Sequence, residues 1–467
     1  MAIIKGLLNK MSVRTVSFII FQNIFILILA SSSYANSPLT LSEAIQRALK
    51  NRYELGIAEQ NILKTKAGLI EAKSELYPRL DITGSSRYTK TIEKFEPIQV
   101  SFDFLGQRYI ISPTKDLPEY QSDISLLVTQ RLFTGGRISG RVEGSRERIG
   151  QGEIVKEISK RDIMISVANA YWELKRNEKM VEIEKEKVKH SEVILQTANG
   201  RYENGAISGL EREKAEVDVI NSRGDLLQAE TSKRIAEDRL LKEMGIIGTD
   251  KEVSFTLKDE PVYDFSMTDE KIIEGAVEQA VQLRPEIKQI KRRIMANEAD
   301  VKVAKANYYP QIDLIGEYSW IGWNKDSLDG AWRDMDSNYW AVLLKINFNL
   351  FEGFATKGKV SLTNAELTAD RLEIEKQRQL ILTEVRRAYN NMIGKAEMVN
   401  ILHKNVTFAE KNLETAKKQF ELGVITINQV AEYNISLSDT RKRYINALID
   451  FEIAKAELRW ASGSELP

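Results

Sequence analysis

The chain contains two copies of one long pattern, and this duplication restricts its fold more than any other feature. The segment LYPRLDI at 76–82 resembles YYPQIDL at 308–314, and the two prolines lie 310 − 78 = 232 residues apart. A second match joins LFTG at 132–135 to LFEG at 350–353, with an offset of 351 − 133 = 218 that persists as far as Gly245 and Gly463. Self-similarity of this length indicates a fold built from two equivalent units.

The two offsets differ by 232 − 218 = 14 residues, so the first copy carries an insertion between about residues 83 and 125. Pro97, Pro113 and Pro118 lie in this insertion, which favours an irregular loop. Residues 246–272 follow the first copy without a counterpart and are expected to form a linker with some local structure. The expected organisation is a signal peptide at 1–35, a first repeat at 36–245, the linker at 246–272 and a second repeat at 273–467.

The N-terminal segment has the features of a secretory signal. Lys5, Lys10 and Arg14 precede an apolar run at 16–30, and small residues then end at Ala35, where we expect cleavage. The alternative is a membrane anchor, but the run is shorter than the roughly 20 residues that span a bilayer. The pattern therefore favours an exported protein whose signal is removed.

Each copy is expected to contain a very long helix with an apolar residue at every seventh position. The first would run from about 137 to 200, which is about 95 Å at 1.5 Å per residue. A strict seven-residue repeat keeps one seam of a helix against a partner helix and predicts coiled-coil packing. The seam residues are Val167, Leu174, Val181, Val188, Leu195 and Tyr202 in the first copy and Val385, Met392, Val399, Val406, Leu413 and Phe420 in the second.

A turn and a returning helix are expected after each long helix. Gly205 and Gly423 are typical helix stops, and Ser208 and Thr426 are placed to cap the next helix. Each copy is thus predicted to be a hairpin of two antiparallel helices, with an apolar seam so thin that neighbours must complete the packing. Residues recurring every seven positions on the returning helices are Ala215, Ser222, Ala229 and Ala236, and Tyr433, Thr440, Ala447 and Ala454.

Shorter helices are expected at the start of each copy, at 41–51 and about 269–283. Ser42 and Thr268 lie where a helix start prefers a capping oxygen. A second, longer helix should follow each of these as far as about residues 76 and 308. The prolines two residues further on cannot continue a helix, so the chain should leave it in an extended conformation.

The extended segments alternate apolar and polar residues with a period of two, as strands of a membrane barrel do. Trp320, Trp323, Tyr339 and Trp340 cluster near the strand ends, as interfacial aromatic residues would. The alternative is a set of strands packed on a soluble core. The residues expected on the apolar face are Ile124, Leu126, Val128 and Leu132, then Ile312, Leu314, Gly316, Tyr318 and Trp320, then Trp340, Val342, Leu344, Ile346, Phe348 and Leu350.

Composition argues against several functional classes. The 67 basic and 67 acidic residues cancel, so no net charge attracts nucleic acid. Without cysteine the chain has no disulfide, thiol nucleophile or thiolate metal ligand, and both histidines, His190 and His403, lie in charged helical stretches. No nucleophile–base set is visible in the sequence. Gly135-Gly136 is an isolated glycine turn, so it does not indicate a phosphate-binding loop. We therefore expect no enzyme, and no catalytic, metal or cofactor site.

Taken together, the sequence resembles the TolC family of outer-membrane efflux proteins from about residue 38 to 463. The opening LTLSEA at 39–44 and the Tyr-Pro elements at 77–78 and 309–310 contribute to the resemblance. LFTGG at 132–136 and YENGAIS at 202–208 complete it. Each element alone is weak, but their order, repeated twice, is specific.

The resemblance implies a mainly α fold with a membrane β part, in which three protomers contribute four strands each to one 12-stranded barrel. The helices would continue that barrel through the periplasm as a coiled-coil α-barrel, with residues 246–272 in an equatorial collar. The function implied is that of an exit duct, a porin-like channel in a tripartite efflux or type I secretion system. Its partners would be two further copies in a homotrimer, a periplasmic adaptor, an inner-membrane ABC or RND-type transporter and outer-membrane lipid.

The family closes its pore and docks its adaptor at the hairpin tips, which here correspond to Gly205, Ser208, Gly423 and Thr426. Some members narrow the tip with rings of aspartate after the second turn. The matching positions are Gln429 and Glu432, so a doubled acidic ring is not expected. Three-fold symmetry still turns a single carboxylate into a ring. The candidate gate residues are Glu432, Gln429, Glu211 and Glu213, which are otherwise acidic or polar residues at ordinary helix starts.

A periplasmic coiled-coil adaptor or scaffold without a membrane barrel is the alternative function. Adaptors have one helical hairpin flanked by compact β-rich modules. This chain has two predicted hairpins, with its strands at the opposite helix ends. The second hairpin favours the duct.

Overall fold

The computed structural model describes residues 38–90, 100–104, 107–111, 119–246, 255–262 and 271–464. The predicted signal peptide, Thr268 and the three prolines of the insertion lie outside the described residues. The chain divides into two compact units, described in turn. The first contains residues 1–60, 153–289 and 374–467, and the second contains residues 61–152 and 290–373.

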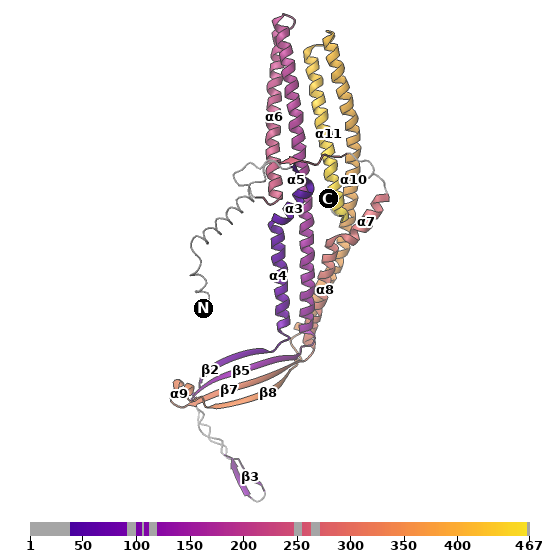
Figure 1. Cartoon of the computed structure of the whole chain (residues 1–467). Helices are drawn as coiled ribbons and strands as arrows, with labels where there is room; N and C mark the ends of the chain where they lie inside the picture. The colour runs from indigo at the N-terminus through magenta and orange to yellow at the C-terminus, as the bar shows by residue number, and fades with distance from the viewer. Residues whose placement is uncertain are drawn as a thin grey trace, which may run out of the picture. The chain divides into compact units, whose positions relative to one another are not determined.

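The same order of elements occurs twice along the chain (Figure 1). The first series is α3 (Leu41–Asn51), α4 (Tyr53–Ser74), β2 (Arg79–Tyr88), β5 (Tyr120–Phe133), α5 (Arg137–Glu203) and α6 (Gly209–Glu243). The second is α7 (Lys271–Leu283), α8 (Pro285–Lys305), β7 (Gln311–Asn324), β8 (Ser337–Asn347), α10 (Ala355–Glu421) and α11 (Ile427–Ser462). The predicted long helices, returning helices and strands are all present. The exact boundaries of the repeats remain predictions.

Smaller elements interrupt or join the two series. Strands β3 (Val100–Phe104) and β4 (Gln107–Ile111) form an antiparallel hairpin in the insertion of the first copy. Helix α9 (Leu328–Arg333) occupies the corresponding loop of the second copy, and a short 3-10 turn, η2 (Ala306–Tyr308), follows α8. In the first unit, β1 (Pro38–Leu39) pairs in parallel with β6 (Thr256–Leu257), which lies within the predicted linker.

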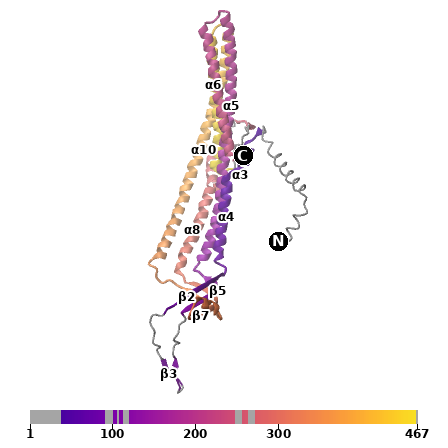
Figure 2. The ribbon, with the colours of Figure 1, turned by 90° about the vertical axis from the view of Figure 1, so that its left-hand side faces the viewer.

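In the first unit, α5 runs beside α6 and α10 runs beside α11, as antiparallel pairs (Figures 1 and 2). The predicted seam is buried along its first turns, at Val167, Leu174, Val385 and Met392. It becomes more exposed towards the turns, where 47% of Tyr202 is accessible. The first hairpin is therefore more exposed at the tip end of its seam, whereas the second keeps a buried cluster of Leu413, Val430 and Leu437 near its tip.

Equivalent residues of the two copies form equivalent hydrophobic cores in the first unit. Each core joins the end of the short helix to the long helix and the returning helix. Because these residues keep the offsets of 232 and 218, the duplication extends to side-chain packing. The pairs are Ala48 and Ala280, Leu55 and Ile287, Ile163 and Ile381, Val167 and Val385, and Ala170 and Ala388.

The start of α3 corrects one expectation. The N-cap is Thr40 rather than Ser42, because Thr40 has an extended backbone and its Oγ1 accepts from the Glu43 amide at 3.2 Å. The Glu43 carboxylate accepts from the Thr40 amide in return, at 3.1 Å. Such a reciprocal pair is a capping box.

The second unit contains a four-stranded antiparallel sheet with the order β2-β5-β7-β8 (Figure 1). At the end of the strands near the helices, Glu75 forms ion pairs with Arg131, Arg137 and Arg141. One carboxylate thus compensates three guanidinium groups where β5 turns into α5. Among the described residues, none of the helices combines the length and apolar character needed to cross a membrane.

Candidate functional site

The register of the four strands separates polar from apolar residues. Successive residues of a strand point to opposite faces, and paired residues share a face. Ser125 pairs with Thr83 and Ser319, and the Ser125 and Ser319 hydroxyls are 2.8 Å apart on the polar face. Every charged residue of these strands falls on that polar face. These residues are Arg79, Asp81, Arg87, Asp123, Arg131, Asp313, Glu317 and Lys345.

The opposite face is apolar over most of its area. Its members come from all four strands and include large side chains such as Val342, which is 65% exposed. An exposed apolar sheet face opposite a charged one suits a wall between lipid and water. The apolar residues are Leu80, Ile82, Ile124, Leu126, Val128, Leu314, Tyr318, Trp320, Trp340, Val342, Leu344 and Ile346.

A β-bulge corrects the expected position of one apolar residue. The alternation predicted Leu132 on the apolar face, but the register shifts between Arg131 and Phe133. Phe133 is therefore the residue opposite Ile312. An extra residue in one strand reverses the alternation beyond it, which the apolar pattern alone does not reveal.

The candidate interfacial aromatic residues divide between the two faces. Trp320 and Trp340 belong to the apolar face. Trp323 and Tyr339 belong to the charged face, where the Tyr339 hydroxyl donates to Glu317 at 2.9 Å. Closeness in sequence grouped these four residues, but alternation along the strands separates them.

Helix α9 covers the apolar face where small residues leave room for it. The Trp332 indole donates to the Ser86 hydroxyl at 3.0 Å. A Cβ added to Gly322 would lie only 1.9 Å from the carbonyl oxygen of Ala331, so only glycine fits there. This contact holds α9 against β5 and β7 at the ends of the strands away from the helices.

Both hairpin turns have the predicted glycine and cap residues. Gly205 and Gly423 each have a φ of +71°, which glycine adopts without strain. Ser208 and Thr426 are the N-caps of α6 and α11. The two turns are therefore built alike, as the duplication predicted.

Two of the four candidate gate residues take part in these caps. The Glu211 carboxylate accepts from the Ser208 amide at 3.3 Å, and the Gln429 amide oxygen accepts from the Thr426 amide at 2.8 Å. Each is the third helical residue of a capping box. The pattern Ser/Thr-x-x-Glu/Gln, present at both turns, could have predicted this role.

Glu432 and Glu213 are exposed near the start of the returning helices. The Glu432 side chain is 69% exposed and lies 3.8 Å from the Lys214 ammonium group, across the gap between α11 and α6. Burial raises the pKa of nearby Asp218, and the charge of Glu432 adds to that effect although Lys214 opposes it. Glu432 is thus a candidate acid that approaches a charged group of the other hairpin.

Further contacts join the two hairpins below the tips. The Arg201 guanidinium lies 3.9 Å from the centre of the Phe420 ring. Arg441 of α11 forms ion pairs with Glu186 of α5 and Glu410 of α10, at 2.7 and 2.8 Å. These contacts join helices that are distant in the sequence, and no local sequence motif predicts them.

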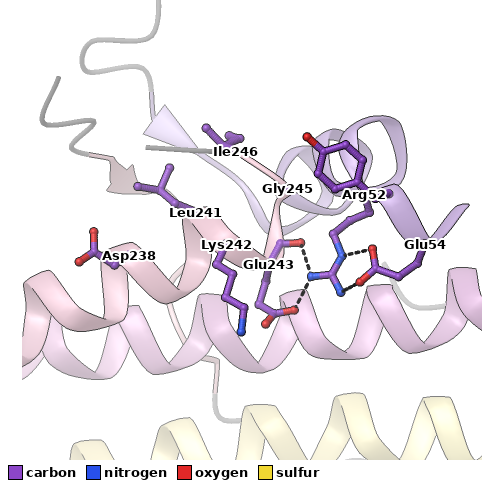
Figure 3. Close-up of a pocket in the computed structure, with 9 residues that line it drawn as sticks. Arg52, Glu54, Asp238, Leu241, Lys242, Glu243, Gly245 and Ile246 are labelled. Atoms are coloured by element: carbon purple, nitrogen blue, oxygen red, sulfur yellow. Dashed lines mark hydrogen bonds and ion pairs between the residues drawn. The ribbon is translucent and has the colours of Figure 1, made fainter. Parts of the chain in front are cut away.

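One hollow of about 610 Å³ lies beside the junction of α3 and α4 in the first unit (Figure 3). Arg52 extends along one wall and binds Glu54 and Glu243. The Glu54 and Glu243 carboxylates are already paired with Arg52, and the hollow is open. An open hollow of this kind suits contact with another protein surface better than enclosure of a small ligand.

A family model, that of the outer membrane efflux protein, matches residues 44–245 and 276–464. The curated relatives are distant but span most of the chain. The cation efflux system protein CusC of Escherichia coli K12 is 19% identical over 415 residues, covering 88% of this chain and 82% of the relative. The pyoverdine export outer membrane protein OpmQ of Pseudomonas aeruginosa is 23% identical, covering 86% and 79%.

Solved structures share the fold. A crystal structure of CusC superposes with a TM-score of 0.73 at 16% identity, covering 91% of this chain and 92% of that one. The outer membrane protein VceC of Vibrio cholerae gives 0.72 at 18% identity, covering 91% and 96%. The match of the family model to both halves carries the assignment. The chain therefore belongs to the outer membrane efflux protein family and is an efflux channel protein of the Gram-negative outer membrane.

Proposed function

We propose that this protein is the exit duct of a tripartite export system, through which substrates pass from an inner-membrane transporter and a periplasmic adaptor to the exterior. The two-faced sheet carries the proposal. Its edge strands, β2 and β8, have no further partner strand among the described residues. Unpaired edges are avoided in stable proteins, and closure into a barrel removes them.

Three copies complete the sheet in this proposal. Since β2 and β8 lie at opposite edges and run in opposite directions, β8 of one copy pairs antiparallel with β2 of the next. Three sheets of four strands then form one barrel with the charged face around water. The helical hairpins form a second barrel, and their exposed apolar residues find partners there. On α6 these include Leu210, Ile220, Leu227 and Ile235.

The duct has no catalytic role in this proposal, and its transporter is of the ABC or RND type. CusC is named for cation efflux and OpmQ for pyoverdine export, and the cargo of this chain is a separate question. The periplasmic adaptor alternative predicts release from native membranes by high salt. We expect the protein to stay in the outer-membrane fraction until detergent is added, and salt release would contradict the duct.

At the tip we propose Glu432 as the acidic ring of the gate. Its exposure and its position towards the first hairpin support this role. In planar bilayers, Glu432→Ala should raise single-channel conductance and weaken cation preference. Glu414→Ala, which removes an exposed carboxylate on the other helix of the same hairpin, α10, serves as the matched control. Conductance and selectivity unchanged in the Glu432 variant would remove it from the gate.

A further inference from the structure

The hollow in Figure 3 borders a small structure that occurs once in each repeat and is called here the arginine clamp. In the first clamp, Arg52 binds the Glu54 carboxylate in a bidentate manner at 2.6 and 2.9 Å. Its remaining nitrogen donates to Glu243 at the end of α6, to the carboxylate at 2.8 Å and to the backbone carbonyl at 3.4 Å. The clamp thus fastens the end of the returning helix to the junction of α3 and α4.

The second clamp has the same geometry. Arg284 binds Glu286 at 2.7 and 3.0 Å and donates to the backbone carbonyl of Ala461, at the end of α11, at 3.4 Å. A further carboxylate comes from Glu384 of α10, at 2.6 Å. Arg284 and Glu286 follow Arg52 and Glu54 by 232 residues, and Ala461 follows Glu243 by 218.

A glycine closes each clamp in the same way. Gly245 and Gly463 have φ of +69° and +81° directly after the returning helices. A Cβ on Gly245 would lie 3.0 Å from the backbone of Asn51, and one on Gly463 would lie 3.0 Å from Leu283. The two clamps are therefore equivalent in backbone and in their Arg–Glu pairs, so a difference in their surroundings is informative.

The second clamp is covered by α5 of the same chain. The Arg161 guanidinium donates to the backbone carbonyl of Trp460, and the Trp460 side chain forms a hydrogen bond with Asp162. The Trp460 ring in turn lies 4.7 Å from the Arg284 guanidinium. Only 3% of the Arg284 side chain is exposed, and Pro285 is buried.

The first clamp has no such cover. The Arg52 side chain is 17% exposed and that of Glu54 is 51% exposed, against 21% for Glu286. Tyr53, which corresponds to the buried Pro285, is 68% exposed. The open hollow lies where α5 lies at the second clamp, since Lys242, one of its lining residues, corresponds to Trp460.

We propose that α10 of a second copy fills this hollow, in the register in which α5 covers the second clamp. The 218-residue offset relates Arg161 and Asp162 to Gln379 and Leu380. Both are exposed on α10, and Leu380 is 45% exposed. Gln379 then donates to the Lys242 carbonyl of the neighbouring copy, and Leu380 enters the hollow beside Tyr53.

This contact is head-to-tail, because α10 of each copy meets the first clamp of the next. Such contacts form closed rings when the rotation permits. The inference rests on the proposed function only in requiring a ring of copies. It adds which surfaces meet. It also implies that α10 contacts the first clamp of the neighbouring chain in the same way as α5 contacts the second clamp of its own chain.

Cysteine cross-linking tests the register in the full-length protein, which contains no cysteine of its own. With Gln379→Cys and Lys242→Cys in one chain, mild oxidation should convert most chains to covalent dimers and trimers on a denaturing gel without reductant. Each single variant should remain monomeric. The matched pair Arg161→Cys with Trp460→Cys should form its disulfide within one chain and yield no ladder.

A second pair, Leu380→Cys with Tyr53→Cys, tests the same contact at a different side-chain geometry. A ladder from either pair supports the proposed register. Native mass measurement of the same variants distinguishes the two proposals. If the variants are trimers but neither pair forms a ladder, the register is wrong and the duct stands. If the unsubstituted protein is a monomer in membranes, both proposals are overturned.

Discussion

At the scale of residues, Tyr171 joins three segments that are distant in the chain. Its buried hydroxyl lies 2.9 Å from the Leu39 carbonyl oxygen and from the Asp259 carboxylate, which share its one proton as acceptors, and it accepts from the Asp259 amide at 3.2 Å. The same carboxylate accepts from the amide of Leu41 at 2.7 Å. One side chain thus holds the pairing of β1 with β6 against α5.

We expect Tyr171→Phe to destabilise this attachment by about 1–3 kcal/mol, because it leaves buried polar groups without their partner. The thermal midpoint in detergent should fall, and protease should cut near residue 40 sooner. Tyr433→Phe, at a position that is 43% exposed, is the control and should change neither. Equal behaviour of the two variants would show that the Tyr171 hydroxyl contributes nothing.

The second clamp predicts a dependence on pH. Burial alone would raise the pKa of Glu286. Hydrogen bonds from Arg284 and from the backbone together lower it by more, so the pKa of Glu286 lies below the ordinary 4.5. A carboxyl with a lowered folded pKa contributes stability above its unfolded pKa and loses it as pH falls through the folded pKa. The contribution should therefore be complete above about pH 4.5 and fade below it.

Thermal midpoints measured from pH 7 to pH 3 check this prediction. Glu286→Gln should lower the midpoint at pH 7 and reduce the loss on acidification. Glu414→Gln removes an exposed partner of Lys418 and should have little effect, because solvent and salt screen a fully exposed ion pair. Parallel pH curves for wild type and Glu286→Gln would contradict the assignment.

At the scale of elements, the sheet permits a test in which the same substitution at two adjacent residues should have opposite effects on membrane insertion. Val342 and Leu343 are 65% and 54% exposed, so exposure does not distinguish them. The register does, because Val342 pairs with Gly316 on the apolar face and Leu343 pairs with Ile315 on the charged face. We expect Val342→Lys to cost about 2–4 kcal/mol per copy, as lysine does near the middle of a bilayer.

Leu343→Lys places the same charge on the water side and should preserve outer-membrane insertion and the trimer. Heat-resistant trimers on mild denaturing gels would measure both variants. Loss of trimer in both, or in neither, would mean that the sheet does not separate lipid from water.

Much of the element order could be predicted from the sequence, for local reasons. A seven-residue repeat, a glycine with positive φ and a hydroxyl cap act over one or two helical turns, so α5, α6, α10 and α11 were predicted closely. Helix α9 and the bulge at Leu132 were not. Both depend on contacts across strands, such as that between Gly322 and Ala331.

The candidate site shows the same limit. The turn glycines and both hydroxyl caps were predicted, since each depends on a few neighbouring residues. The local Ser/Thr-x-x-Glu/Gln pattern could also have predicted the capping boxes of Glu211 and Gln429, whose role in a gate stays a prediction. The ion pairs of Arg441 and the cover over Arg284 could not be predicted, because they require knowing which helices become neighbours.

At the scale of the whole molecule, the proposed gate requires hairpins that are held together strongly enough to close and weakly enough to part. Arg441 joins α11 to α5 and α10 through Glu186 and Glu410. The adjacent Lys442 lies 2.5 Å from the carboxylate of Glu184 on α5, but that side chain is only 6% exposed, so this pair belongs to the buried packing. The exposed Arg441–Glu186 pair joins the two hairpins and contributes about 0–1 kcal/mol, so it is a weak latch, whereas the buried seam is a strong one.

Removing that latch should therefore favour the open tip without unfolding the hairpins. We expect Arg441→Ala to raise single-channel conductance, while the helical signal and thermal midpoint change little. Arg223→Ala is the matched control, since Arg223 pairs with Glu192 inside the first hairpin, at 2.7 Å. It removes a similar ion pair without freeing one hairpin from the other and should leave conductance unchanged. Equal conductance in all three proteins would mean that the seam and the neighbouring copies alone hold the tip closed.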